Sequence, residues 1–214
     1  MDMIIMFIRF LLSLFLVLVI STGAFAKPIK FIVNDPSGRD HVSFTSDAPI
    51  ELIVGRTNKI KGEVIIDDSL DLKKLPPKVS FEVDLASIDT GISLRNEHMR
   101  DNFLETKKYP KTIFVVTKIA PLSKLQDGKT INLTGKGDFT VHGITVQKDI
   151  PVQVTYYKES DFTHNKFEHG DVIRVKSTFE IPLDEHKIKR PEVIMQKLAE
   201  KVIVTIDTYA NAKE

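Results

Sequence analysis

The sequence predicts a mainly β protein, in which an antiparallel sheet closes into a barrel and one or two short helices are added. Three observations lead to this prediction. Apolar and polar residues alternate along successive segments, turn motifs separate these segments, and glycines interrupt one long strand where a sheet could bend sharply. A β-sandwich would show the same alternation, but the long strands and the glycine bends favour the barrel.

The first 26 residues resemble a secretory signal peptide. Arg9 precedes an apolar run, and Ala24-Phe25-Ala26 provides an A-x-A cleavage site. A retained membrane anchor is the alternative, but the apolar core is shorter than the roughly 20 residues that a spanning helix needs. We therefore expect cleavage, export to the periplasm or secretion, and a single domain over residues 27–214 without a membrane-spanning segment.

Composition narrows the possible partners. The 214 residues include no cysteine, so neither disulfides nor a lipid-modified cysteine can be present. Lysine and arginine together number 30 and aspartate and glutamate 29, and no basic patch with interleaved aromatic residues occurs. Nucleic acid is therefore not an expected partner.

The clearest strand is KVSFEVDLA, residues 78–86, which reads as half-buried. Its apolar face carries Val79, Phe81, Val83 and Leu85. Segment 49–55 repeats the pattern, with Ile50, Leu52 and Val54 on the apolar face. Segment 63–67 does so with Val64 and Ile66.

The remaining strands follow the same logic. Segment 112–119 is apolar on both faces and rich in β-branched residues. In segment 130–141, Gly135 and Gly137 share a register with apolar residues, so the strand could bend there. Segments 149–157, 171–181 and 201–209 complete the predicted set.

Two segments break this period of two. Residues 93–105 predict a short helix, with Ser93 as N-cap and Met99 and Phe103 one helical turn apart. Residues 190–200 are a second helical candidate, with Pro191 suited to the first turn.

The segment SIDTGISLRNEHMRDNFLETKKYPKTIF, residues 87–114, resembles the first signature of the YceI-like family, the polyisoprenoid-binding or lipid-binding YceI-like domain. The segment GDFTVHGITVQKDIPV, residues 137–152, resembles the second signature. The matching positions are Ser87, Thr90, Gly91, Arg95, His98, Met99, Phe103, Tyr109, Pro110, Phe139, Thr140, His142, Gly143 and Thr145. The resemblance covers nearly all of residues 29–209. A second aromatic residue near Phe103 is missing, and the loop 158–170 departs from the family pattern.

The resemblance implies a lipocalin-like antiparallel β-barrel that holds an amphiphile with a long chain. The expected partner is a polyisoprenoid, a quinone-like compound or a fatty lipid, with no other cofactor and a homodimer as a possibility. The candidate lining residues are Phe81, Val83, Leu85, Phe114, Val116, Leu133, Phe139 and Phe179. Alternation alone does not distinguish such a lining from a packed core.

The segment NEHMRDNF, residues 96–103, carries groups that could perform acid–base chemistry. On a helix His98 would border the apolar face and be partly buried, while Asn96 would point to water. A general base needs a substrate proton within about 3 Å, and no partner motif is visible. We therefore interpret Arg95 and His98 as structural residues or head-group contacts. His142 is interpreted as a turn residue, which could still approach the barrel mouth as a head-group contact.

The segment DFTHNKFEHGD, residues 161–171, collects possible metal ligands: Asp161, His164, Glu168, His169 and Asp171. The spacing matches no defined metal motif, so a polar solvated loop without metal is expected. The predicted function is that of an exported binding protein and not of an enzyme. Two alternatives stay open: a lipid-processing enzyme that uses Arg95 and His98, with His142 as a further possible group, and an interaction module with a filled barrel.

Overall fold

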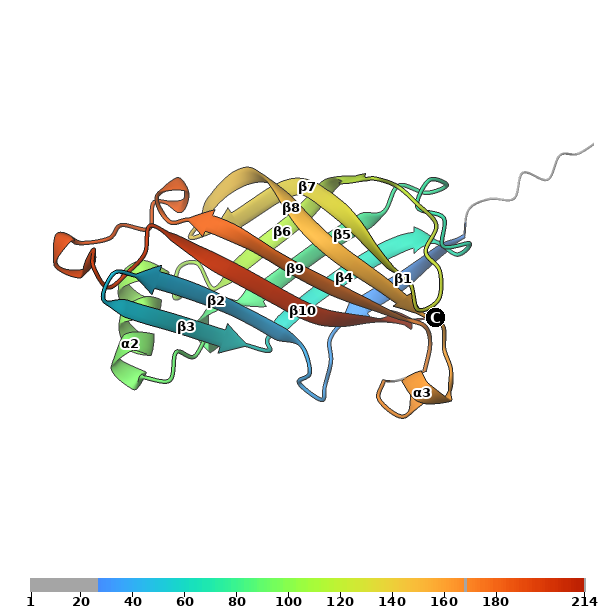
Figure 1. Ribbon diagram of the computed structural model, residues 1–214, viewed down its shortest axis with the longest axis horizontal. Coiled ribbons are helices and arrows are strands. Elements are labelled where there is room, and N and C mark those ends of the chain that lie inside the picture. The colour runs from blue at the N-terminus through green and yellow to red at the C-terminus, as the bar shows by residue number, and fades with distance from the viewer. Residues whose placement is uncertain (1–26, 168, 214) are drawn as a thin grey trace, which may run out of the picture.

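Figure 1 shows the computed structural model, which describes residues 27–167 and 169–213. The predicted signal peptide, residues 1–26, lies outside the described residues. Within the described part of the chain, no helix is both long enough and apolar enough to cross a bilayer.

The described residues form ten strands that all pair antiparallel, in the order β1-β4-β5-β6-β7-β8-β9-β10-β2-β3. Because β1 also pairs with β10, eight of these strands close into a barrel, and the β2–β3 hairpin extends the sheet from β10. The bounds are β1 (Pro28–Val33), β2 (His41–Ala48), β3 (Glu51–Thr57), β4 (Ile60–Asp67), β5 (Lys78–Asp84), β6 (Lys111–Ala120), β7 (Thr130–Val141), β8 (Ile144–Tyr157), β9 (Val172–Pro182) and β10 (Lys201–Lys213). The predicted closed antiparallel barrel is confirmed.

Each segment with predicted alternation forms a strand, but β1 and β2 were missed. Strand β1 is short and its apolar residues do not alternate regularly with polar ones. Its residues Phe31 and Val33 are nevertheless fully buried. Ile32 is apolar although it shares the outward face with Lys30, so the alternation of polar and apolar residues is incomplete. The strand is fixed by its two neighbours, β4 and β10, which close the barrel around it.

The face predicted as buried in β3 is wrong. Ile50 and Leu52 are each 62% exposed and Val54 is 45% exposed, whereas Ile53 and Gly55 face the interior. Strand β3 is the last strand of the sheet, and its register with β2 sets which residues point inward. A shift of one residue in the pairing register turns every side chain of a strand to the opposite face of the sheet. The register, and with it the buried face, is decided by the tertiary pairing.

The predicted helix over 93–105 is confirmed as α2 (Ser93–His98), which continues as a π-helical turn over Met99–Phe103. Its N-cap is Ile92 rather than the expected Ser93, and the cap makes no side-chain hydrogen bond. Met99 is buried and Phe103 packs against the same part of the core, as their spacing predicted.

The second predicted helix, over 190–200, is wrong, because the structure has only a 3₁₀ turn at Glu192–Ile194 there. The backbone of this segment bonds elsewhere. The Gln196 carbonyl accepts from Ile50 N–H at 3.1 Å, and Ala199 N–H donates to Ser46 Oγ at 2.9 Å. These bonds attach the segment to the β2–β3 hairpin. A short helix, α3 (Asp161–His164), and 3₁₀ turns at Leu85–Ser87 and Asp184–His186 complete the elements.

Gly137, one of the two positions where the sequence predicted a bend in β7, lies opposite an irregularity in β6. The β6–β7 register shifts between Val116 and Lys118, and a Cβ atom on Gly137 would lie 2.1 Å from the Val115 carbonyl oxygen. A residue with a side chain would therefore collide with the backbone of β6. A Cβ atom on Gly135 would meet its neighbours at 3.7 Å, an ordinary contact distance.

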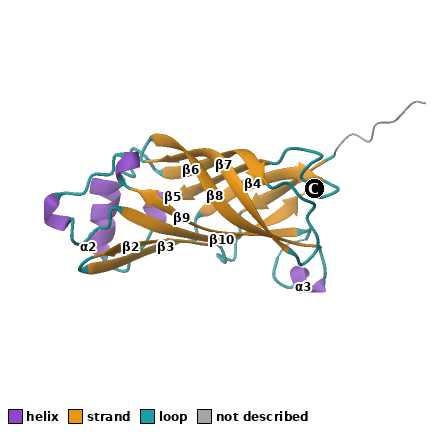
Figure 2. Cartoon of the chain, turned by 45° about the horizontal axis from the view of Figure 1, so that its top comes forward, coloured by secondary structure: helices purple, strands orange, loops and turns teal. Residues whose placement is uncertain are grey.

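The two ends of the barrel differ. At one end, the loops after β4 and β6 bond to each other through Leu72 N–H to Ser123 O and Leu125 N–H to Leu70 O. This pairing places Leu72 and Leu125 inside the barrel end as buried residues. Helix α2 lies at the other end, beside the β2–β3 turn, and α3 lies at the end with the loops (Figures 1 and 2).

Candidate functional site

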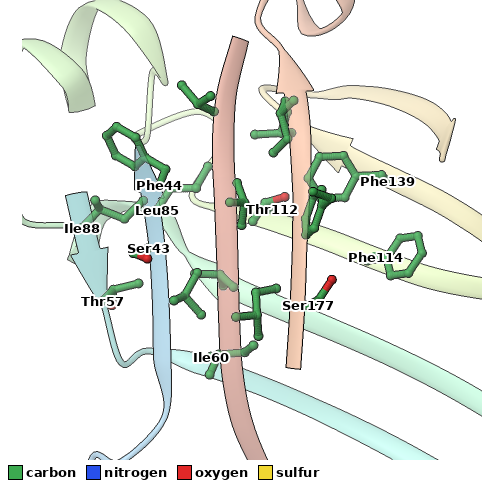
Figure 3. Close-up of a pocket in the computed structure, with 18 of the residues that line it drawn as sticks. Ser43, Phe44, Thr57, Ile60, Leu85, Ile88, Thr112, Phe114, Phe139 and Ser177 are labelled. Carbon is green, nitrogen blue, oxygen red and sulfur yellow. The ribbon is translucent and has the colours of Figure 1, made fainter. Parts of the chain in front are cut away.

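The barrel encloses a cavity of about 900 Å³. Small-molecule pockets usually occupy about 300–1,000 Å³, so this one is large. All predicted lining residues border it: Phe81, Val83, Leu85, Phe114, Val116, Leu133, Phe139 and Phe179 (Figure 3 labels several of them). The barrel is therefore hollow, which removes the premise of the filled-barrel alternative.

Aromatic rings form one part of the cavity wall. The Phe139 ring meets Phe114 at 6.3 Å and Phe179 at 5.9 Å between centroids, both edge to face. Phe44 on β2 borders the same cavity, with β10 between it and Phe179 on β9. Edge-to-face packing holds these rings in place and leaves an apolar surface toward the cavity.

Two hydroxyl groups in the wall bond to the protein itself. Thr112 Oγ1 donates to the Thr140 carbonyl at 2.8 Å, and Ser177 Oγ donates to the Pro151 carbonyl at 2.6 Å. Because each hydroxyl already donates its proton within the protein, neither group needs a hydrogen-bond acceptor on a ligand. The inner part of the cavity therefore suits a hydrocarbon chain.

Among the described residues, the charged, imidazole and amide side chains that border the cavity lie toward the α2 end. They are Glu51, Arg95, His98, Asn102, Lys189 and Lys197. Among the apolar lining residues at the same end, Ile92 is 51% and Leu94 61% exposed, so the cavity opens to solvent there. The site thus combines an apolar interior with a charged entrance.

Arg95 connects the two elements that flank this entrance. Its Nη1 donates to Glu51 Oε1 on β3 at 2.8 Å, while Nε and Nη2 donate to the side chain and carbonyl of Thr90 at 2.9 and 2.7 Å. These bonds attach α2 to β3 and to the segment before α2, as the structural interpretation of Arg95 would require.

Asn96 and His98 do not lie as the sequence predicted. Asn96 is buried, and its Oδ1 accepts from Thr90 N–H at 2.8 Å and from Thr90 Oγ1 at 2.7 Å. Its Nδ2 donates to Asp89 Oδ1 at 2.6 Å. His98 is exposed at the entrance instead of partly buried. The helix is rotated so that the short amide, which can satisfy three backbone and side-chain groups, faces inward.

Further bonds join β3 to the segment before α2. Thr57 Oγ1 lies 2.6 Å from Ser87 Oγ, and Arg56 and Asp89 exchange backbone hydrogen bonds at 2.9 and 3.0 Å. On one side β3 pairs with β2, and on its other side it has no strand partner. There these bonds and the Arg95–Glu51 pair join β3 to the segment before α2 and complete the wall.

His142 lies in the β7–β8 turn, as predicted. It has φ 52° and is followed by Gly143 with φ 72°, as a two-residue hairpin turn of the primed type requires. Its Nδ1 lies 3.0 Å from the His186 carbonyl oxygen and its Nε2 lies 2.6 Å from Glu105 Oε2. Both ring nitrogens are thus engaged within the protein, and His142 is not among the residues lining the cavity.

His186 is a buried residue that the sequence analysis did not identify. Its Nδ1 lies 3.1 Å from the Ile144 carbonyl oxygen, and its ring packs edge to face on Phe139 at 5.5 Å. Burial lowers the pKa of this imidazole, so it stays neutral.

The loop 158–171 is polar and exposed, as expected, but it brings some of its residues together. His164 and His169 lie beside Glu159, which the sequence analysis did not include among the possible ligands. Asp171 is used elsewhere, since its carboxylate accepts from Tyr156 OH at 2.6 Å. Glu168 lies outside the described residues.

Two curated proteins are similar to this chain in sequence. The UPF0312 protein of Shewanella denitrificans is 27% identical over 117 residues, which cover 54% of this chain and 56% of that protein. A UPF0312 protein of Pseudomonas putida is 30% identical over 122 residues, 56% of this chain and 57% of that protein. The matches thus span just over half the length of these relatives.

Solved structures extend the similarity to the whole barrel. BcnA of Burkholderia cenocepacia superposes with a TM-score of 0.63 at 19% identity, covering 84% of this chain and 99% of that one. A polyisoprenoid binding domain from Saccharophagus degradans gives 0.63 at 18% identity, covering 87% and 100%. The YCEI protein of Campylobacter jejuni gives 0.58 at 18% identity, covering 75% and 85%.

At such identities the solved structures show a shared fold. The family itself is shown by sequence, because the profile of the YceI-like domain matches residues 35–210. This range includes every strand from β2 to β9 and most of β10, the entrance helix and the hairpin turn at His142, and it leaves out β1. The chain therefore belongs to the YceI-like domain family.

Proposed function

We propose that this protein binds one amphiphile with a long isoprenoid or fatty chain inside its barrel and sequesters or carries it. The observation that supports this most is the cavity of about 900 Å³, which is apolar within and charged only at its entrance. An amphiphile has the same distribution of polarity. Its chain would lie among the phenylalanine rings and its polar head would lie at the α2 end.

The energetics favour a long chain. Burying one CH₂ group contributes about 0.8 kcal/mol, so a five-carbon isoprene unit contributes roughly 4 kcal/mol. Association costs on the order of 4–15 kcal/mol. A single unit therefore binds weakly, and each added unit raises the affinity without any specific polar contact.

The entrance suits a polar or anionic head group. Lys189, Lys197 and His98 are exposed there and border the cavity. Arg95 is already bonded to Glu51 and Thr90, so it positions α2 rather than meeting the ligand. We place the head group beside the two lysines and His98.

The similarity to known proteins supports this class of ligand. The Saccharophagus degradans domain, which shares the fold over its whole length, is described as polyisoprenoid binding. The signal-peptide pattern of residues 1–26 supports export, and we propose the periplasm, or the medium after secretion, as the place of action.

We propose binding without turnover. In the lipid-processing alternative, Arg95 and His98 would act chemically, with His142 as a further possible group, but Arg95 and His142 are held by bonds within the protein. His98 is the one of these three whose position at the entrance would allow contact with a head group.

The test begins with untagged protein purified from its own host, extracted with organic solvent and analysed by mass spectrometry. Lipid-free protein is then titrated with prenyl alcohols of increasing length and with fatty acids, by calorimetry. Affinity should rise steeply with chain length and level off when the cavity is full. No copurifying lipid and no binding of any long chain would overturn the carrier proposal, and steady conversion of a lipid ester or quinone would favour the enzyme.

A further inference from the structure

Three potential metal ligands converge in the loop 158–171, which joins β8 to β9 at the end of the barrel opposite α2 (Figure 1). His164 Nε2 lies 2.6 Å from His169 Nδ1 and 2.9 Å from Glu159 Oε1. His169 Nδ1 lies 3.3 Å from the same carboxylate oxygen. The side chain of His169 is 90% exposed and could point freely into water, yet its Nδ1 faces the other two groups.

These distances are close to those of a tetrahedral metal site. Nitrogen and oxygen ligands lie about 2.0–2.2 Å from Zn²⁺, which places them about 3.3 Å from one another. Two of the three separations here are shorter, at 2.6 and 2.9 Å, and the third is 3.3 Å. Side-chain rotations that move the ligand atoms apart by less than about 1 Å would make room for an ion between them.

Hydrogen bonds near both ends of the loop fix the backbone that carries the three potential ligands. Ser160 and Thr163 form a capping box at the start of α3, and Thr163 is buried. Asp171 Oδ1 accepts from Glu159 N–H at 2.8 Å, while its other oxygen accepts from Tyr156 OH. These bonds fix the backbone on which Glu159 and His164 are carried.

The middle of the loop packs on the barrel. The Phe167 ring lies 5.1 Å from the Tyr209 ring on β10, and the Arg39 guanidinium lies 4.2 Å from the Phe167 centroid. Gly170 has φ 105°, and a Cβ atom there would lie 2.9 Å from the Ala212 carbonyl oxygen. The chain that flanks His169 is therefore held close to β10 and is largely arranged before any ion arrives.

We propose that Glu159, His164 and His169 bind one divalent transition-metal ion of the Zn²⁺ or Cu²⁺ type, with solvent in the remaining positions. Two imidazole nitrogens and one carboxylate suit such borderline ions, whereas Ca²⁺ and Mg²⁺ prefer sites built from oxygen atoms. Exposure of the cluster leaves the outer positions to water, as in zinc sites with three protein ligands. The ion would join the end of β8 to the start of β9, far from the cavity entrance.

The proposal is tested by calorimetric titration of untagged protein with ZnCl₂ in a non-chelating buffer. One Zn²⁺ per chain is expected. His164→Ala and His169→Ala should each weaken binding by at least tenfold, and Glu159→Gln should weaken it less than either. His41→Ala is the matched control, because His41 is an exposed histidine on β2 outside the cluster, and it should bind Zn²⁺ like the wild type.

Circular dichroism of the metal-free variants checks that each one folds, and a second readout is the melting temperature. Zn²⁺ should raise the melting temperature of the wild type and of His41→Ala but not of His164→Ala, since an ion that binds only the folded state stabilises it. Excess Mg²⁺ should not compete. Absence of Zn²⁺ binding to the wild type, or equal binding by His164→Ala and His169→Ala, would overturn the proposal. Neither result would bear on lipid binding at the opposite end.

Discussion

Arg95 on α2 and Glu51 on β3 form an ion pair at 2.8 Å that joins the two sides of the cavity entrance. Their side chains are 23% and 34% exposed, and Arg95 also binds Thr90 through two further donors. Surface ion pairs usually contribute little to stability, but a partly buried arginine with all its bonds made contributes more. The pair is therefore expected to control both the stability of the entrance and its opening.

Replacing Arg95 by methionine should lower the free energy of unfolding by about 1–3 kcal/mol, because Glu51 and the Thr90 carbonyl lose their partner. Amide hydrogen exchange over α2 should also become faster. The matched control is Lys111→Met, which breaks the more exposed Lys111–Glu82 pair and should change stability by less than about 1 kcal/mol. Equal effects of the two substitutions would contradict the role of Arg95.

Val83→Trp tests the cavity as the ligand site. Val83 lines the cavity near the end of β5, and open space beside it leaves room for the larger ring. The variant should fold with a melting temperature near that of the wild type and lose affinity for long-chain lipids. The chain has no other tryptophan, so fluorescence of the new residue reports on the cavity directly. Folded protein with undiminished binding would place the ligand elsewhere, and a large loss of stability in lipid-free protein would indicate close packing.

Asn96 and His98 should respond in opposite ways to replacement by alanine. Asn96→Ala leaves the buried Thr90 N–H without its acceptor and should cost about 1–3 kcal/mol of stability. His98→Ala removes an exposed side chain and should change stability by less than about 0.5 kcal/mol. Chemical denaturation of both variants measures this difference. Loss of a lipid-converting activity in His98→Ala, with stability unchanged, would support the enzyme alternative.

Gly137 and Gly135 offer a matched pair on one strand. Gly137→Ala brings a methyl group against the β6 backbone at the register shift, so stability should fall by more than about 1 kcal/mol. Gly135→Ala meets only side chains at ordinary distances and should be neutral or slightly stabilising, since it also reduces the freedom of the unfolded chain. Thermal melts of the two variants decide whether the bulge needs a glycine.

Asp35 should make stability depend on pH in the acid range. Its carboxylate accepts from the Arg39 side chain at 2.9 and 2.8 Å, and this lowers the pKa of Asp35 from 3.8 to about 2. Because the folded-state pKa is depressed, the contribution is present above about pH 4 and is lost as pH falls toward 2. After allowance for the partial exposure of Arg39, it amounts to about 1–2 kcal/mol.

The measurement compares wild type with Asp35→Asn by denaturant unfolding at several pH values. The wild type should be more stable at pH 7, and the difference should shrink between pH 4 and pH 2. A difference that stays constant over this range would show that the charge of Asp35 does not stabilise the fold.

The sequence by itself determined the strands that have a regular alternation, the helix at residues 93–105 and the candidate lining of the cavity. Alternation in β5 and β7 identified one apolar face, and all the predicted lining residues on it border the cavity. This succeeded because the side-chain period of a strand is local and is written directly in the order of residues. The two signatures also identified the family, because such signatures consist of particular residue types at fixed spacing.

Only the tertiary structure decided what each face meets. The apolar face of β3 is exposed because its register with β2 and its place at the end of the sheet turn Ile53 inward instead. Whether the barrel is hollow depends on how its strands close through the β1–β10 pairing, which no single segment encodes. Likewise Glu51 and Arg95, 44 residues apart, meet only because the hairpin and α2 flank one opening. A pattern along the chain defines faces, and the packing of distant segments decides what lies against them.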